Sequence, residues 1–346
     1  MINNIFTEGI KYIGSKRLII PHILDIVRTL DIHSVCDLFT GTTRVAQALK
    51  QCGYMVITND FTSYSKTFAN CYIVNNSKRQ KIQGILDKLN SLEGKDGWFS
   101  SKYAGGAQSI DVNPIMFWQR HNTEKLDAIR EKIEEYGGLT KDILLSSLIL
   151  AMDKVDNTVG VQQAFLKNSW SKRSYNTMRL EMPKMIIGKK GLAYKQDATK
   201  LASKIFPDLF YLDPPYTTHN YYSYYHIWET IIRNDAPEVY GITNRRKDTR
   251  QHKSLFNSIR TAKNEMKMLL EKISSHYILI SYNNEGIIPE DVMIAMCQEV
   301  GHTMIRRIDY KRNVMCDIGR FGSDGKRRSE KNKIKNMEYL FLIEKS

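Results

Sequence analysis

The residues best suited to bind a flat heterocycle bearing an amino group are Asp213-Pro214-Pro215-Tyr216. They follow the apolar run 209–212, which is typical of a short buried strand. Proline lacks the amide donor that a strand needs, so the chain must leave the sheet there with a fixed backbone. The Asp213 carboxylate and the Pro214 carbonyl can then accept two hydrogen bonds from the amino group, while the Tyr216 ring stacks on the base. The alternative is an ordinary turn, because Asp and Pro are common in turns.

A second set of residues near the amino terminus has the spacing of a nucleotide-binding unit. The segment 34–39 predicts a buried strand, followed by a turn at Gly41 and a helix over 44–50. A glycine at such a turn lets the backbone approach a nucleotide. Asp60 closes the next apolar segment, roughly twenty residues further on, where an acid can accept hydrogen bonds from ribose hydroxyls. Asp60 could also cap the helix that follows it.

The apolar pattern predicts the elements that must position these residues. Predicted strands cover 34–39, 54–58, 191–196, 209–212, 277–281, 303–310 and 338–343. Predicted helices cover 18–30, 44–50, 82–89, 122–135, 141–152, 227–232 and 255–273. Strands and helices alternate except between 80 and 190, where helical patterns dominate, which indicates an inserted domain.

The charge of the chain favours nucleic acid as a partner. The 346 residues carry a formal net charge of +14. Basic side chains displace counterions from a phosphate backbone. A basic peripheral membrane protein is the competing interpretation, but no amphipathic helix with one clean basic face stands out.

Three basic segments are candidate DNA contacts. The segment 163–190 combines basic, aromatic and amide side chains, which suits phosphate and base-edge contact, although a solvated surface is an alternative. A second cluster lies at 245–250, and 320–335 is a basic, nearly apolar-free stretch, typical of a DNA-facing or disordered loop. The candidate residues are Lys167, Lys172, Arg173, Arg245, Arg246, Arg327 and Arg328.

The remaining composition limits cofactors and location. Five cysteines are widely separated without a Cys-x-x-Cys pair, and eight histidines lack metal-ligand spacing. We therefore expect reduced cysteines and no metal. No charged-then-apolar leader or bilayer-length apolar run is present, which predicts a cytoplasmic protein.

Taken together, these motifs resemble the Dam-like class of N(6)-adenine-specific DNA methyltransferases of the restriction-modification type. The resemblance rests on Lys11-Tyr12-Ile13-Gly14-Ser15-Lys16, on Phe39 with Gly41, on the Asp-Pro-Pro-Tyr motif, on His226 with Glu229, and on Tyr282-Asn283-Asn284-Glu285-Gly286. It implies an α/β, Rossmann-like fold with a mixed, mostly parallel seven-stranded sheet and an inserted, mainly helical target-recognition domain. It divides the chain into a first methyltransferase segment (1–79), the inserted segment (80–190) and a second methyltransferase segment (191–346).

The resemblance also implies methyl transfer from S-adenosyl-L-methionine (AdoMet) to a flipped-out adenine in duplex DNA. Cofactor contacts are expected from Tyr12, Lys16, Phe39, Gly41, Asp60, Asp197 and Asp213. Asp213, Pro214 and Tyr216 are the expected catalytic residues. Asp197 could instead cap a helix, and His226 is best interpreted as structural. Thr43 replaces the second glycine of the family's Phe-x-Gly-x-Gly pattern, which questions how closely the backbone approaches the cofactor.

Two alternatives stay open at this point. The amino-binding corner accommodates any amino-bearing base, so an N(4)-cytosine or RNA methyltransferase is possible. A catalytically silent DNA-binding module is the other. A cognate restriction endonuclease would act on the same site without a stable complex.

Overall fold

The computed structural model describes residues 5–76, 81–311 and 335–345, and the chain forms two compact units. Unit 1 comprises Met1–Leu30, Thr40–Gln196 and Tyr221–Lys253. Unit 2 comprises Asp31–Phe39, Asp197–Asn220 and Ser254–Ser346. Each unit combines segments that are distant in the sequence. The functional boundaries predicted near 79 and 190 stay a prediction.

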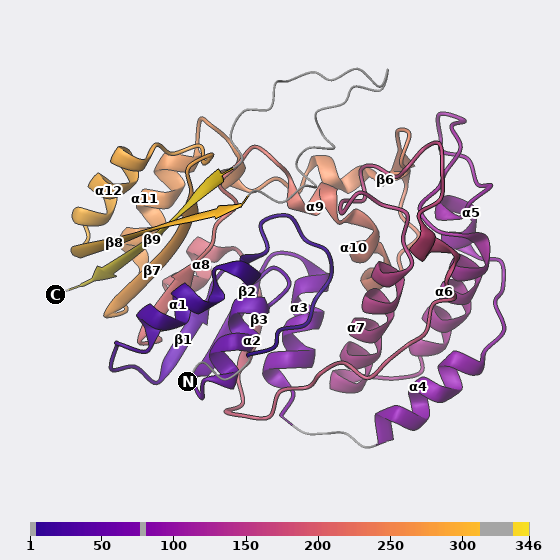
Figure 1. The fold of residues 1–346 in the computed structure, drawn as a ribbon, viewed down its shortest axis with the longest axis horizontal. Helices are drawn as coiled ribbons and strands as arrows, with labels where there is room; N and C mark the ends of the chain where they lie inside the picture. The colour runs from indigo at the N-terminus through magenta and orange to yellow at the C-terminus, as the bar shows by residue number, and fades with distance from the viewer. Residues whose placement is uncertain (1–4, 77–80, 312–334, 346) are drawn as a thin grey trace. The chain divides into compact units, whose positions relative to one another are not determined.

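A mixed sheet of seven strands carries the motifs at its strand ends (Figure 1). Its strands are β1 (Ser34–Asp37), β2 (Met55–Asp60), β3 (Leu192–Lys195), β4 (Leu209–Leu212), β7 (Tyr277–Asn283), β8 (His302–Lys311) and β9 (Lys335–Glu344). The order is β3-β2-β1-β4-β7-β9-β8. The pairs β2–β3, β1–β4 and β4–β7 are parallel, whereas β9 runs antiparallel to β7 and β8. This doubly wound order confirms the predicted Rossmann-like fold.

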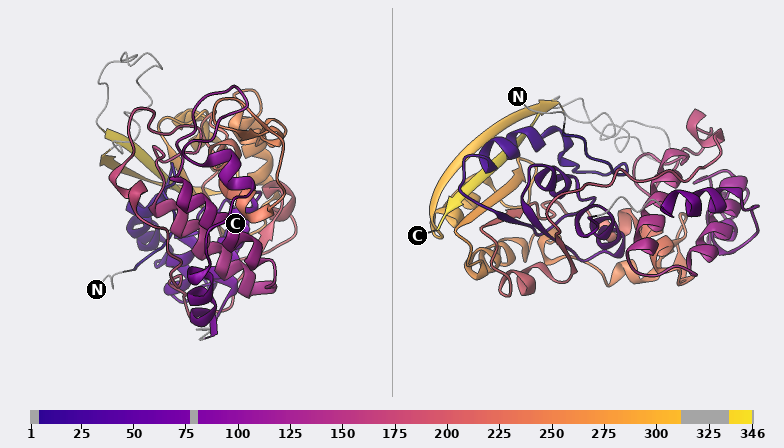
Figure 2. Two further views of the ribbon diagram at one scale, coloured as in Figure 1. Left: turned by 90° about the vertical axis from the view of Figure 1, so that its right-hand side faces the viewer. Right: turned by 90° about the horizontal axis from the view of Figure 1, so that it is seen from below.

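Every predicted strand is present, although β2, β7, β8 and β9 extend one or two residues beyond their predicted carboxyl ends. All four residues of β4 are at most 1% exposed, as expected for a parallel strand covered on both faces. In unit 2, β8 and β9 form a long curved pair (Figure 2). Helices α8 (Ala198–Ala202), α11 (Ala262–Lys272) and α12 (Glu290–Gln298) complete this unit.

Unit 1 is mainly helical outside its two strands of the sheet. Its α-helices are α1 (Ile20–Val27), α2 (Arg44–Gln51), α3 (Ser63–Ala69), α4 (Lys81–Ser91), α5 (Trp98–Tyr103), α6 (Arg120–Ile133), α7 (Gly138–Lys154), α9 (Tyr221–Tyr224) and α10 (His226–Arg233). A two-stranded hairpin, β5 (Val239–Tyr240) with β6 (Arg245–Arg246), follows them. In Figure 1, α4, α6 and α7 lie together, and all three come from the inserted segment. The helices agree with the helical patterns predicted for this segment, and its status as an inserted domain stays a prediction.

The helix predicted over 255–273 is wrong at its start. A short 3-10 helix, η5 (Leu255–Asn257), comes first, and α11 begins only at Ala262. The Thr261 hydroxyl donates to the Leu255 carbonyl at 2.6 Å. Such local side-chain to backbone hydrogen bonds compete with helix continuation.

Candidate active site

The turn after β1 is closed by the acid at the end of β2. Gly41 has a φ of +49°, in the left-handed region that favours glycine. Its N–H donates to Asp60 Oδ2 at 3.0 Å, while Asp60 Oδ1 accepts from the Thr62 N–H at 3.0 Å and the Thr62 hydroxyl at 2.8 Å. Burial raises the pKa of the Asp60 carboxyl, and these hydrogen bonds oppose that rise. Asp60 thus holds the glycine turn and the start of α3 together.

Tyr12 lies against this turn. A Cβ atom added at Gly41 would lie 3.4 Å from Tyr12 Cε1, which is contact distance. The Tyr12 ring stacks on Tyr225, with centroids 4.4 Å apart, and on Tyr221, with centroids 5.5 Å apart. The Ile13 N–H donates to the Tyr225 hydroxyl at 2.7 Å and fixes this arrangement. Aromatic faces attract cations, so the stack suits a ligand with a positive centre.

Thr43, which stands in place of the second glycine of the Phe-x-Gly-x-Gly pattern, keeps a backbone conformation typical of glycine. Thr43 is fully buried and has φ 64° and ψ 12°. Its Oγ1 accepts from Gln47 Nε2 at 2.9 Å, and its N–H donates to the Thr40 carbonyl at 2.7 Å. A β-branched residue rarely adopts this conformation, so the backbone is strained there. The turn is therefore retained despite the missing glycine.

The motif around Tyr12 is anchored by buried charges. Lys11 Nζ lies 2.8 Å from Asp156 Oδ1 and 3.4 Å from Asp153 Oδ1, at the end of α7. Burial raises the pKa of Asp153 to about 6, although Lys11 opposes the rise. Lys16, predicted to contact the cofactor, is 5% exposed at the first position of the 3-10 helix η1 (Lys16–Leu18).

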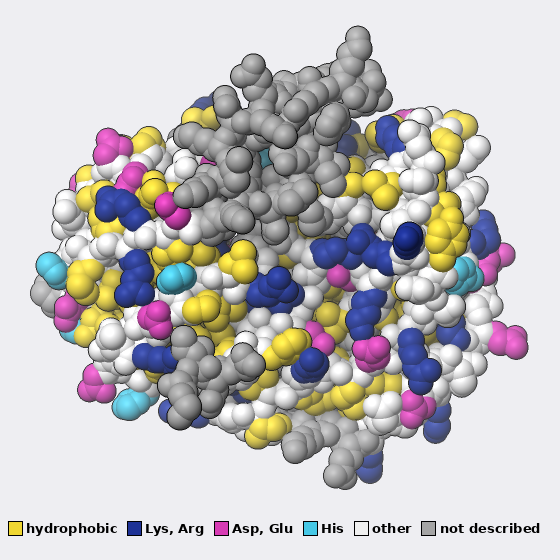
Figure 3. Space-filling view, in the orientation of Figure 1, with side chains coloured by type: hydrophobic (Ala, Val, Ile, Leu, Met, Phe, Trp, Pro, Cys, Tyr) yellow, Lys and Arg dark blue, Asp and Glu magenta, His cyan; other side chains and the backbone are white. Residues whose placement is uncertain are grey.

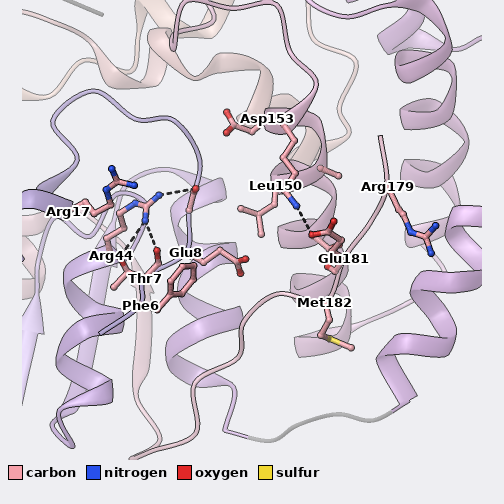
Figure 4. Close-up of a pocket in the computed structure, with 14 residues that line it drawn as sticks. Phe6, Thr7, Glu8, Arg17, Arg44, Leu150, Asp153, Arg179, Glu181 and Met182 are labelled. Carbon is pink, nitrogen blue, oxygen red and sulfur yellow. Dashed lines mark hydrogen bonds and ion pairs between the residues drawn. The ribbon is translucent and has the colours of Figure 1, made fainter. Parts of the chain in front are cut away.

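A cavity of about 240 Å³ lies in unit 1 and is lined by residues that flank this motif (Figure 4). Arg44 crosses one wall, where its Nη1 donates to the Thr7 carbonyl at 2.6 Å and its Nη2 to the Gly9 carbonyl at 2.9 Å. The charged lining residues are Glu8, Arg17, Arg44, Asp153, Lys154, Arg179 and Glu181. Side chains of both signs suit a zwitterionic group better than a simple anion.

In unit 2, Asp213 stands directly after β4, at its carboxyl end. The parallel register pairs Tyr211 with Asp37 of β1 and with Leu279 of β7, so Phe39 is level with Asp213 on the neighbouring strand. Asp213 and Tyr216 are partly exposed, whereas Pro214 is buried. The strand order reverses at β1 and β4, and open α/β sheets bind ligands at such points.

The Tyr216 ring rests on a side chain whose role the sequence did not reveal. Its centroid lies 5.4 Å from that of Tyr282, at the end of β7, with the rings inclined by 60°. The Ile287 N–H donates to the Tyr216 carbonyl at 2.7 Å. The Ile288 N–H donates to the Tyr282 hydroxyl at 2.9 Å. The element 282–286 is recognisable in the sequence, but its contact with Tyr216 is not.

The other two cofactor candidates of unit 2 have structural partners. Phe39 packs edge-to-face on Phe256, with centroids 5.2 Å apart. Asp197 is the N-cap of α8, where its Oδ1 accepts from the Lys200 N–H at 2.9 Å. Its side chain is exposed, so capping leaves it accessible to a ligand.

His226 and Glu229 of α10 hydrogen-bond to segments of unit 1 outside their own helix. His226 is fully buried, and its Nε2 lies 3.1 Å from the Gln162 carbonyl, to which it donates. Burial lowers the pKa of His226 to about 3, so the ring is neutral. Glu229 Oε2 accepts from the Ser63 N–H at 2.8 Å, at the start of α3. The structural interpretation of His226 therefore agrees with its surroundings, although its partner lies outside its own helix.

The predicted DNA contacts differ in availability. Lys167 and Lys172 are exposed. Arg173 is engaged by the buried Asp156, with Nη2 2.8 Å from Oδ1. Arg327 and Arg328 lie outside the described residues. In Figure 3 several basic side chains neighbour one another on the part of unit 1 that carries α7.

The hairpin arginines have different surroundings. The Arg245 guanidinium lies 5.0 Å from the Tyr240 ring centroid. Arg246 is 1% exposed and contacts both carboxylate oxygens of Asp235, at 2.6 and 2.8 Å, and both of Asp248, at 3.0 and 2.8 Å. A guanidinium buried and occupied in this way is a structural group of unit 1 and cannot reach a phosphate from this position.

In the described ranges, no group of three or more His, Cys, Asp or Glu side chains is arranged to hold a metal ion. Within the same ranges, the helices are too short or too polar to cross a membrane.

A doubly wound sheet with a glycine turn after β1, an acid closing β2 and an Asp-Pro-Pro-Tyr corner after β4 defines a Rossmann-like methyltransferase. The sequence matches the model of the D12 class N6 adenine-specific DNA methyltransferases over residues 12–296. The chain belongs to this family, which confirms the resemblance seen in the motifs.

Individual relatives agree with this assignment. The chain is 36% identical over 330 residues to the modification methylase StsI of Streptococcus sanguinis, covering 87% of this chain and 48% of the relative. It is 30% identical over 347 residues to the type II methyltransferase M.NlaIII of Neisseria lactamica, covering 97% of this chain and 99% of that protein. It thus spans about half the length of StsI and of M.FokI from Planomicrobium okeanokoites, of which 52% is covered.

Proposed function

We propose that this chain transfers a methyl group from AdoMet to N(6) of adenine in double-stranded DNA, as the modification enzyme of a restriction-modification system. The observation that carries the proposal is the Asp-Pro-Pro-Tyr corner at the carboxyl end of β4, inside the range matched by the family. The names of StsI and M.NlaIII, a modification methylase and a type II methyltransferase, support the biological setting. A cognate endonuclease acting on the same site is part of the proposal.

The residues of unit 1 fit the chemical groups of AdoMet. The Asp60 carboxylate can still accept a hydrogen bond from one ribose hydroxyl at Oδ2, because that oxygen has two acceptor sites and only the Gly41 N–H uses one of them. Charges of both signs beside the Lys11–Lys16 motif suit the zwitterionic methionine portion, and the Tyr12 stack suits a sulfonium. Lys16 and Gly41 of unit 1, and Phe39 and Asp197 of unit 2, are the further candidate contacts. When bound, AdoMet supplies the electrophilic methyl group.

The corner in unit 2 would prepare the adenine nitrogen. The Asp213 carboxylate and the Pro214 carbonyl accept hydrogen bonds from the two amino hydrogens, so the nitrogen lone pair is withdrawn from conjugation with the ring. The Asp213 carboxylate would stabilise the positive charge that develops on the nitrogen during methylation. Because the amino group becomes acidic only then, the carboxylate is placed to accept the proton that the nitrogen releases. The Tyr216 ring stacks on the base and fixes its plane.

Duplex DNA is the proposed substrate, and the target base must leave the stack. Unstacking and unpairing require a few kcal/mol, which contacts to the backbone must offset. The formal net charge of +14 supports such contacts. Lys167, Lys172 and Arg245 are the described candidates, and Arg327 and Arg328 are candidates from the sequence.

The test is methyl transfer from labelled AdoMet to DNA and to RNA, followed by nucleoside analysis. We expect label in N(6)-methyladenine from DNA, whereas N(4)-methylcytosine or labelled RNA would support the alternatives. Asp213→Ala should lower turnover at least about a hundredfold while sequence-independent DNA binding persists. Asp291→Ala, an exposed acid in the first turn of α12, is the matched control. Turnover retained by Asp213→Ala would refute the assignment of the corner.

A further inference from the structure

We propose that Tyr282 is a positioning residue that sets the plane of Tyr216, and that residue 286 must be glycine to seat it. The inference rests on the proposed function, in which Tyr216 stacks on the flipped adenine. Tyr282 does not touch the substrate in this role. It acts through the ring that does.

The first observation is the fit between Tyr282 and Gly286. A Cβ atom built at Gly286 would lie 2.2 Å from Tyr282 Cε1, 2.5 Å from Cζ and 2.7 Å from the hydroxyl oxygen. Contacts this short do not occur in proteins, so any larger residue at 286 would displace the ring. Because Gly286 has no left-handed φ, the requirement comes from the closeness of the ring and not from the backbone conformation.

The second observation is that one loop hydrogen-bonds to both tyrosines. The turn begins at Asn283, whose carbonyl accepts from the Gly286 N–H at 2.9 Å. The next two amides then point to different partners: Ile287 donates to the Tyr216 carbonyl and Ile288 to the Tyr282 hydroxyl. The backbone of one ring and the tip of the other are therefore fixed by consecutive residues.

The third observation concerns exposure. Tyr282 is 2% exposed, whereas Tyr216 is partly exposed. Their centroids are 5.4 Å apart at an angle of 60°, a tilted contact in the range that aromatic pairs favour. The buried ring thus supports the exposed one from one side and leaves part of it available to a base. Positioning of this kind contributes to rate, because a small misplacement of a stacked substrate moves the reacting nitrogen off line.

The decisive variants are Tyr282→Leu and Tyr282→Phe. Both lose the hydroxyl that accepts from Ile288, so they differ only in whether a flat ring remains behind Tyr216. We expect Tyr282→Phe to keep kcat within about threefold of the parent and Tyr282→Leu to lower kcat at least about tenfold. AdoMet affinity by calorimetry should change less than twofold in both.

A second pair of variants tests the close contact between Gly286 and the Tyr282 ring. Gly286→Ala should reproduce the kcat loss of Tyr282→Leu, whereas Gly84→Ala should not, because an added Cβ at Gly84 in α4 meets nothing within 4 Å. After the recognised site has been mapped from methylated DNA, 2-aminopurine at the target position reports the stacking of the extruded base. Its emission in the complex should match the parent for Tyr282→Phe and differ for Tyr282→Leu and Gly286→Ala.

The outcomes separate the two proposals. A parent protein that does not methylate adenine refutes the proposed function itself. An active parent with equal kcat and equal 2-aminopurine emission in Tyr282→Leu and Tyr282→Phe refutes the positioning role. Equal losses in both variants refute it as well, because they assign the effect to the hydroxyl. If Gly286→Ala does not fold, the leucine and phenylalanine pair decides alone.

Discussion

Thr43 offers a sharp test of the local structure, because it holds a conformation that threonine avoids. At φ 64° and ψ 12°, a residue with a Cβ atom is destabilised by about 1–2 kcal/mol relative to glycine. Glycine loses about 0.5–1 kcal/mol of that advantage through its greater backbone entropy in the unfolded chain. The backbone conformation taken alone therefore favours Thr43→Gly over Thr43→Ala by roughly 1 kcal/mol.

The comparison between the glycine and alanine variants removes the contribution of the Thr43 hydroxyl and methyl groups, because both variants lack them. Both substitutions delete the hydrogen bond from Gln47 Nε2 to Thr43 Oγ1, worth about 1 kcal/mol. Both also delete a buried methyl group, worth about 0.8 kcal/mol. Thr43→Ala should therefore lose roughly 2 kcal/mol of unfolding free energy relative to the parent. Thr43→Gly also deletes the buried Cβ atom, worth about 0.8 kcal/mol, which offsets most of the backbone advantage of glycine, so this variant should lose about as much.

The assay is urea unfolding, with the midpoints compared at an unchanged dependence on denaturant. The same pair at Lys88, an exposed position of α4, is the control. At Lys88 the alanine variant should be more stable than the glycine variant by about 1 kcal/mol, as in an ordinary helix interior. The stability difference between the two variants must therefore shift toward glycine by about 1 kcal/mol from position 88 to position 43. The same alanine advantage at both positions would show that residue 43 is not left-handed.

The remaining predictions concern buried charge and DNA binding. His226 binds a proton less readily when folded (pKa about 3) than when unfolded (about 6.5), so stability is lost as pH falls below 6.5. Between pH 7 and pH 5 the loss from this group is about 2 kcal/mol, and His226→Gln should unfold with a pH dependence smaller by that amount. Arg246→Met removes the buried one of the two arginines that contact both Asp235 and Asp248, while Arg233 stays beside them. It should lower the unfolding free energy by about 2 kcal/mol, whereas the exposed Lys247→Met should leave the midpoint unchanged. Duplex affinity measured by fluorescence anisotropy should fall about a thousandfold between 50 and 200 mM salt if about six phosphates are contacted, and an affinity independent of salt would contradict nucleic-acid binding.

Strand ends were predictable from the sequence because they depend on local chemistry. The run 209–212 is apolar and Pro214 cannot donate to a ladder, so the corner after β4 followed without knowledge of any neighbour. The glycine turn at Gly41 was predictable for the same reason. The contact between Tyr216 and Tyr282 was not, because it depends on which strands pair, and β4 pairs with a strand from much later in the chain.

The arginine pair at the hairpin shows the opposite situation. Arg245-Arg246-Lys247 reads as one solvated basic cluster, since all three residues carry the same charge. On a strand, successive side chains point to opposite faces, so Arg246 turns inward while its neighbours turn outward. Burial then requires carboxylates, and Asp235 and Asp248 provide them. The sequence predicted no strand at 245–246, so neither the inward direction of Arg246 nor its partners could be predicted from it.

The structural and functional interpretations of the motif acids are compatible with each other. Asp60 accepts from the Gly41 and Thr62 N–H groups, and Asp197 is the N-cap of α8, so both make the contacts that a purely structural residue would make. Such contacts, however, fix the carboxylate at the end of a strand, where a ligand at the edge of the sheet would meet it. An acid that was free to rotate would lose more entropy on binding than one already held by backbone amides. The contacts with backbone amides thus hold each carboxylate ready to accept a hydrogen bond from a ribose hydroxyl or an amino group. They are compatible with the cofactor role proposed for either residue.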